Sequence, residues 1–165
     1  MQQYAASFVT LLSDFITVYQ NLASLAKEKT NILVQGDVQK LDALLTQETE
    51  LLIGAGKLEK QRAGLIAEWG RAAGWTTGEI TTQSIMSQIE ESSRTAMEGK
   101  VRELKRVLDE IRALNKTNSE LIEQSLQFVN YSLELMSGPD VGGMTYGANG
   151  ALGDRQGYKI LDQKV

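Results

Sequence analysis

The chain contains no cysteine and no histidine among its 165 residues. Without cysteine it has neither disulfide bonds nor a thiol nucleophile, and without histidine it lacks the commonest general acid and base and the usual zinc and di-iron ligands. The sequence therefore argues against an enzyme and predicts neither a metal site nor another cofactor. The absence of cysteine also fits a reducing compartment.

Long apolar runs are missing as well. No segment approaches the roughly 20 consecutive apolar residues that a membrane span needs. The first positive charge is Lys27, so no secretory signal with a cationic leader is visible. The net charge of -4 disfavours nucleic acid or an anionic membrane as the main partner. We therefore expect a cytoplasmic protein with no nucleic-acid partner and no membrane insertion.

One local strip of the chain is basic, although acidic residues interrupt it. We interpret it as a solvated helix face with spaced ion pairs rather than as a phosphate site. The glycine-rich stretch Gly54-Ala55-Gly56-Lys57 is not a phosphate loop either, because Leu51 and Leu58 stand where the motif needs glycine and Ser or Thr. The strip consists of Lys100, Arg102, Lys105, Arg106 and Arg112, with Glu103, Asp109 and Glu110 between them.

Glycine and proline divide the chain into two parts. Seven of the 15 glycines and the single proline, Pro139, fall within the last 28 residues. Because these residues end helices, the remainder can be helical and the end cannot. The sequence predicts a helical domain over residues 1–137 and a flexible Gly-rich tail over residues 138–165.

The first half of the chain predicts an antiparallel helical hairpin. Apolar residues recur at spacings of three and four over residues 3–34 and again over residues 38–73. Between the two segments, Gly36-Asp37 supplies a helix stop followed by an N-cap, which favours a tight turn. Facing positions of a tight hairpin bring Lys29 close to Glu48, and such a pair would fix the register of the two helices. Arg62 occupies a further position of the same seam.

A third, longer helix is predicted over residues 98–137, after a break at residues 74–78 and a short helix at about residues 82–91. Whether the short helix merges with the long one is left open by the sequence. Within the long segment an apolar residue recurs every seven positions without a break. The predicted fold class is all-α, a long antiparallel hairpin plus a further long helix in a coiled-coil-like bundle. The heptad column consists of Val107, Leu114, Leu121, Phe128 and Leu135.

The apolar face of this long helix widens toward its C-terminal end. Before residue 118 the apolar arc covers about 120°, which suits one core-facing stripe, whereas beyond it the arc covers about 180°. Two interpretations remain open, a second neighbour in the core or a docking surface for a partner's helix. The candidate partner-binding residues are Leu121, Ile122, Leu126, Phe128, Val129, Leu133, Leu135 and Met136.

Two asparagines, Asn115 and Asn118, interrupt the apolar seam just before it widens. Buried amides cost stability unless they find hydrogen-bond partners, so both need an explanation. One hypothesis is a pair inside the bundle that fixes register, which is a known use of seam asparagines. The other is that the two residues mark the point where the core-facing half of the helix gives way to the partner-facing half.

In these features the sequence resembles the FlgN family of flagellar export chaperones, over nearly its whole length. The residues from Trp75 to Thr95 do not contribute to the likeness. The resemblance rests on the order of several short motifs: Lys29, Gly36-Asp37, Leu41 and Glu48; Leu51-Leu52 and Leu58-Glu59 before Arg62; Leu114-Asn115, Asn118, Leu121-Ile122 and Phe128-Val129; and Tyr146-Gly147 with Gly150.

The resemblance implies a cytoplasmic, non-enzymatic chaperone. Such a protein would bind the C-terminal helical region of the hook-associated proteins, which form the hook-filament junction of the bacterial flagellum. It would keep them from assembling early and deliver them to the export gate of the flagellar type III secretion apparatus. The alternative function is a structural coiled-coil adaptor or a self-assembling helical dimer. The two can overlap, because a chaperone without its client could pair with itself through the exposed face.

Overall fold

The computed structural model describes residues 1–76 and 81–137. These residues form four α-helices and no strand, namely α1 (Gln2–Gln35), α2 (Val38–Ala73), α3 (Thr82–Ser87) and α4 (Glu91–Ser137). The predicted all-α class is confirmed. The predicted Gly-rich tail, residues 138–165, lies outside the described residues, so the domain boundary at residue 138 stays a prediction. The chain divides into two compact units, Met1–Ile122 and Glu123–Val165, which we describe separately.

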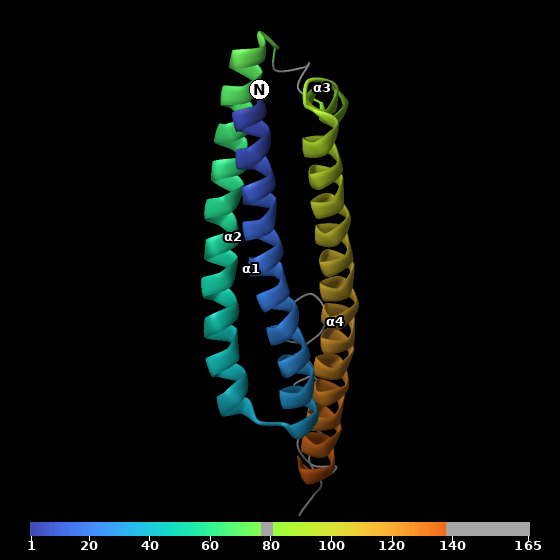
Figure 1. Cartoon of the computed structure of the whole chain (residues 1–165). Helices are drawn as coiled ribbons and strands as arrows, with labels where there is room; N and C mark the ends of the chain where they lie inside the picture. The colour runs from blue at the N-terminus through green and yellow to red at the C-terminus, as the bar shows by residue number, and fades with distance from the viewer. Residues whose placement is uncertain (77–80, 138–165) are drawn as a thin grey trace, which may run out of the picture. The chain divides into compact units, whose positions relative to one another are not determined.

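The turn between α1 and α2 has the predicted chemistry. Gly36 ends α1 with φ 68° and ψ 24°, a left-handed conformation that glycine adopts without a side-chain clash. The N–H groups of Gly36 and Asp37 donate to the carbonyl oxygens of Leu33 and Ile32, at 3.2 and 3.3 Å. Asp37 then caps α2 by accepting the backbone N–H of Lys40 at 3.0 Å. These two residues reverse the chain, and α1 and α2 run antiparallel beside each other (Figure 1).

The cap at Asp37 predicts a pH-dependent contribution to stability. The pKa of Asp37 lies below its usual 3.8, first because the backbone N–H of Lys40 stabilises the carboxylate. A carboxyl whose folded pKa is lowered stabilises the fold above its unfolded pKa, and this contribution is lost as the pH falls through the folded value. We therefore expect Asp37→Ala to lower the urea midpoint at pH 7 and the difference from wild type to shrink below about pH 3.8.

The matched control for this measurement is Asp42→Ala, which removes an exposed carboxylate from the next turn of α2. Its effect on the urea midpoint should be small at every pH, since the side chain of Asp42 caps no helix. If Asp37→Ala lowers the urea midpoint equally at pH 3 and at pH 7, the carboxylate does not stabilise the turn through its charge.

In the unit Met1–Ile122, α1 contributes most of the core. In Figure 1 it lies between α2 and α4, so two of its faces are covered. Its seam with α2 contains the expected polar pair, because Lys29 Nζ lies 2.5 Å from Glu48 Oε2 and both side chains are at least four-fifths buried. The role of this pair in fixing register stays a prediction. The buried residues of α1 are Ala5, Leu11, Leu12, Phe15, Ile16, Leu22, Ala23, Ala26 and Ile32.

Arg62, which was predicted to occupy the seam, pairs within its own helix. Its guanidinium forms a bidentate contact with Glu59 on its own helix, through Nε to Oε2 at 2.8 Å and Nη2 to Oε1 at 2.5 Å. This contact lowers the pKa of Glu59 and raises that of Arg62. The arginine side chain is long, so its charged end can reach out of the interface even though its Cα occupies a seam position. Arg62 therefore contributes an ion pair within α2, and its predicted role in the seam stays a prediction.

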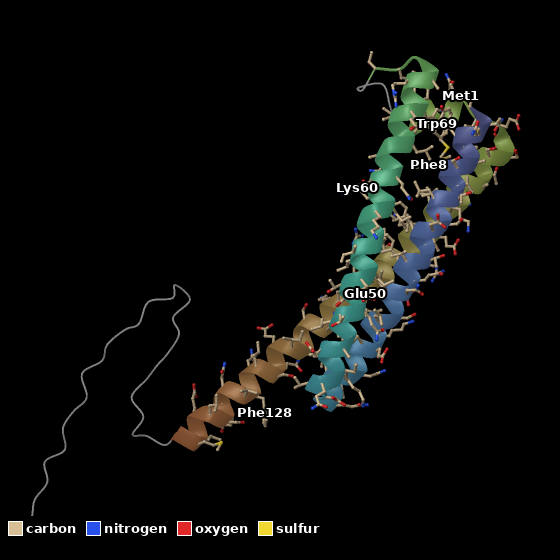
Figure 2. The ribbon with its side chains drawn as sticks, turned by 90° about the vertical axis from the view of Figure 1, so that its left-hand side faces the viewer. Met1, Phe8, Glu50, Lys60, Trp69 and Phe128 are labelled. Atoms are coloured by element: carbon tan, nitrogen blue, oxygen red, sulfur yellow. The ribbon has the colours of Figure 1, made fainter. Side chains whose placement is uncertain are left out.

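Aromatic packing closes the end of the unit near α3. Trp69 is fully buried and its indole stacks on Tyr4 with ring centres 6.0 Å apart, while Phe8 meets it edge-on at 6.4 Å (Figure 2). Thr81 and Ser84 form a capping box that starts α3. Ile85 and Ile89 bury their side chains in the same cluster.

The break before the long helix corrects the sequence prediction. The predicted short helix ran to about residue 91, but α3 already ends at Ser87, and α4 begins at Glu91 rather than at residue 98. The two helices do not merge, since the backbone leaves the helical conformation at Gln88. Ile89 is buried against the cluster around Trp69, and a turn between the helices is what brings it there.

The two mid-helix glycines of α2, Gly54 and Gly56, are not required by close packing. No neighbouring atom lies within 4 Å of where a Cβ would stand at either position. The helix continues through both. Among the described residues, no helix is both long and apolar enough to cross a membrane.

Candidate functional site

The N-terminal two thirds of α4 pack on α1. Val107 is buried and Leu104, Leu108, Ile111 and Leu114 are half-buried, as the heptad pattern predicts. An ion pair joins the two helices at their surface, with Lys27 Nζ 2.8 Å from Glu110 Oε1. The hydrogen bond from Lys27 is the main reason that the pKa of Glu110 lies below its usual value. This part of the helix therefore belongs to the core of its unit.

Asn118 is a buried polar contact between α4 and α1. Only 3% of its surface is exposed. Its Nδ2 donates to the carbonyl oxygen of Ala26 at 2.9 Å, and its Oδ1 accepts the hydroxyl of Thr30 at 2.6 Å. The two partners, Ala26 and Thr30, lie one turn apart on α1, so a shift of α4 along α1 would break both hydrogen bonds. The geometry supports a register-fixing role for Asn118.

Asn115 does not join Asn118 in the seam. Its side chain is exposed, so the predicted buried pair of asparagines is a single one. Residues three positions apart on a helix point in directions that differ by about 60°, and this difference turns Asn115 out of the contact with α1. Asn118 is also close to the point where burial ends. Beyond it, Leu121 is half-buried, and exposure dominates from Ile122 onward.

The C-terminal part of α4 carries a wide exposed apolar surface, which we call the α4 face. The exposed fractions of its large apolar residues run from 42% at Ile122 to 85% at Met136. In Figure 2, Phe128 is labelled in the orange part of α4, and 70% of its surface is exposed. Core burial therefore does not explain these residues within the described part of the chain. The α4 face comprises Ile122, Leu126, Phe128, Val129, Tyr131, Leu133, Leu135 and Met136.

Seven of the eight residues predicted to bind a partner lie on the α4 face, and Leu121 lies at its half-buried start. Their role in binding stays a prediction, which the exposure of their side chains favours over the alternative of a second core neighbour. Tyr131 was missed by the sequence reasoning, because its hydroxyl kept it out of the apolar pattern. It is 59% exposed. Its position three residues after Phe128 and four before Leu135 is the signal that could have found it.

The charged residues in this part of α4 are all acidic. Residues 117–137 contain Glu120, Glu123 and Glu134 and no lysine or arginine. Glu120 lies 4.0 Å from Lys116, one turn earlier. In the described part of the chain, no three carboxylates gather where they could hold a metal ion. At about 100° per residue, Glu123 and Glu134 lie on the side of the helix opposite the centre of the α4 face. The surface is thus a wide apolar one, which is suited to packing against another helix and offers no reactive group.

Comparison with known proteins finds a family match and a similar bacterial protein. Residues 1–153 match the family described as FlgN protein, so the match includes all four helices and the whole α4 face. The Uncharacterized protein YvyG of Bacillus subtilis (strain 168) is 23% identical over 132 residues, which cover 80% of this chain and 80% of that protein. No solved structure matches the chain.

Proposed function

Because the chain belongs to the FlgN family, a family of flagellar export chaperones and not of enzymes, we propose that it binds the C-terminal helical region of hook-associated proteins through the α4 face. The proposal includes delivery of these clients to the flagellar type III export gate from the cytoplasm. The single observation that carries it is the α4 face, where eight large apolar side chains are exposed within 15 residues of one helix.

The chemistry of the α4 face suits an amphipathic helix as the client segment. Proteins that polymerise through amphipathic terminal helices expose apolar stripes until they assemble, and a second helix with a wide apolar face can cover such a stripe. Aromatic and methionine side chains supply adaptable contacts of this kind, and the α4 face offers Phe128, Tyr131 and Met136. Binding of the free client alone then delays assembly by mass action, and no nucleotide is needed.

The proposed function is tested by titrating the full chain with a C-terminal helical fragment of a hook-associated protein in a calorimeter. We expect saturable binding with a dissociation constant of about 1 µM or below, which is ordinary for a specific interface. The same hook-associated protein without its C-terminal region is the control and should not bind. Binding of both forms alike, or of neither, would overturn the proposal.

A further inference from the structure

The α4 face is wider than one neighbouring helix can cover. At about 100° per residue, its apolar side chains span an arc of about 220°, from Tyr131 at one edge to Leu126 at the other. A single helix packed on one flank of this arc would leave the other flank exposed. The remaining side of the helix carries polar residues, namely Glu123, Gln127, Asn130 and Glu134.

The unit Met1–Ile122 shows how wide an apolar arc one neighbour and two neighbours require. α1 lies between α2 and α4 (Figure 1), and its buried residues cover an arc of about 200°. From Leu104 to Leu114, α4 packs on α1, and its apolar arc is about 120° there. The arc of the α4 face therefore matches that of a helix with two neighbours.

The α4 face divides into two stripes, whose centres differ by about 150° in direction. Ser125 and Ser132 occupy the gap between the stripes, and the hydroxyl of Ser132 donates to the carbonyl oxygen of Phe128 on its own helix, at 2.8 Å. Gln124 interrupts the first stripe one turn before Phe128. The first stripe consists of Phe128, Tyr131 and Leu135, and the second of Ile122, Leu126, Val129, Leu133 and Met136.

Two stripes that point about 150° apart cannot pack against the same helix. Helices in contact have axes about 8–10 Å apart, so two helices on the two stripes would have axes about 17 Å apart. A tight helical hairpin, whose two axes lie at contact distance, would cover one stripe and leave the other exposed. The α4 face therefore fits two amphipathic helices on opposite flanks of α4, as α2 and α4 flank α1.

A single client molecule that supplies both helices binds more tightly than two separate molecules. Each stripe is small, with three large apolar side chains in the first and five in the second, whereas a specific interface has about 20–30 residues on each side. When the two helices are joined, binding of one raises the effective concentration of the other at its stripe. The linker must span about 17 Å, which takes about five extended residues or more.

We propose that the client of the α4 face contributes two amphipathic helices from one molecule, one packed on each stripe. The inference rests on the proposed function, because it specifies which kind of client segment the same surface receives. It adds that the two helices are joined by a linker rather than by a tight turn, and that one client molecule binds one chain.

The absence of cysteine allows thiol protection to test contact on both stripes. Leu135→Cys places a thiol in the first stripe, Leu133→Cys places one in the second, and the matched control Glu134→Cys places one on the polar side. All three positions are exposed, so maleimide should modify each free variant readily. With the whole C-terminal helical region of a hook-associated protein at saturation, we expect the modification rate to fall at least about tenfold in both stripe variants and to stay within about twofold in the control.

Shortening the client to a single helix separates the two contacts. This fragment should protect one of the two stripe thiols and leave the other reactive, and it should bind at least about tenfold more weakly than the whole region. Protection of both thiols by a single helix would overturn the inference, as would a complex of two client molecules with one chain. A stripe thiol that is unreactive before client is added would also overturn it, because the chain itself or a second copy would then occupy that stripe.

Calorimetry with the whole C-terminal region distinguishes a failure of this inference from a failure of the proposed function. If the region binds and protects only one of the two stripe thiols, the proposed function stands and the two-helix client is wrong. If the region does not bind the wild-type chain, the proposed function fails and the two-helix client fails with it.

Discussion

Replacing Phe128 by aspartate abolishes capture of the client fragment while the helical fold survives, if the α4 face is the binding site. Phe128 has the largest side chain without a polar atom on that face and is 70% exposed. Aromatic anchors at the centre of an interface typically account for 2 kcal/mol or more of binding, and a carboxylate there must also be desolvated. We expect the dissociation constant measured by calorimetry to rise by about 100-fold or more.

The fold should not respond to this substitution, because the described structure buries little of Phe128. Circular dichroism and the thermal midpoint should therefore match the wild type. The control is Val34→Asp, which places the same charge at another 70% exposed apolar residue, on α1 next to the turn. Val34→Asp should leave capture unchanged. Capture by Phe128→Asp within about threefold of wild type would contradict the mapped site, since that is less than 1 kcal/mol.

The helices of this protein could be predicted where local chemistry alone determines them. Gly36 and Asp37 supply a left-handed stop and a side-chain cap within two residues, and no tertiary contact is needed to place the turn. Gly74 likewise ends α2 in a left-handed conformation. The start of α4 could not be predicted, because it depends on the burial of Ile89 against the cluster around Trp69. That contact joins residues from distant parts of the chain.

The candidate site also combines a feature that one helix determines with others that depend on tertiary contacts. The widened apolar arc is a property of one helix, so the sequence could predict the α4 face. Which asparagine lies in the seam depends on how α4 is rotated against α1, and the sequence did not distinguish Asn115 from Asn118. The cleft that Ile66 and Met97 line depends on side chains from four helices, and no periodicity in a single segment reveals it.

Asn118→Asp should destabilise the fold strongly, although it only replaces the amide nitrogen of the side chain by an oxygen. The substitution removes the Nδ2 donor and places a carboxylate oxygen against the carbonyl oxygen of Ala26, at a position that is 3% exposed. A buried charge without a compensating partner costs several kcal/mol, or the carboxyl protonates instead. We expect the free energy of unfolding in urea to fall by about 3 kcal/mol at pH 7, and the loss to shrink at acidic pH as the carboxyl is protonated.

Asn118→Leu is the informative comparison, because it removes the hydrogen bonds without leaving a buried charge. Thr30 keeps an acceptor after this change, since its hydroxyl also lies 3.1 Å from the carbonyl oxygen of Ala26. An apolar side chain of similar size fits the seam, so the cost should stay within about 1 kcal/mol. The lost amide should appear instead as faster hydrogen exchange in the turns of α4 around Asn118, because no polar contact then fixes their register. If Asn118→Leu loses as much stability as Asn118→Asp, the amide stabilises the fold itself and the register-fixing role is wrong.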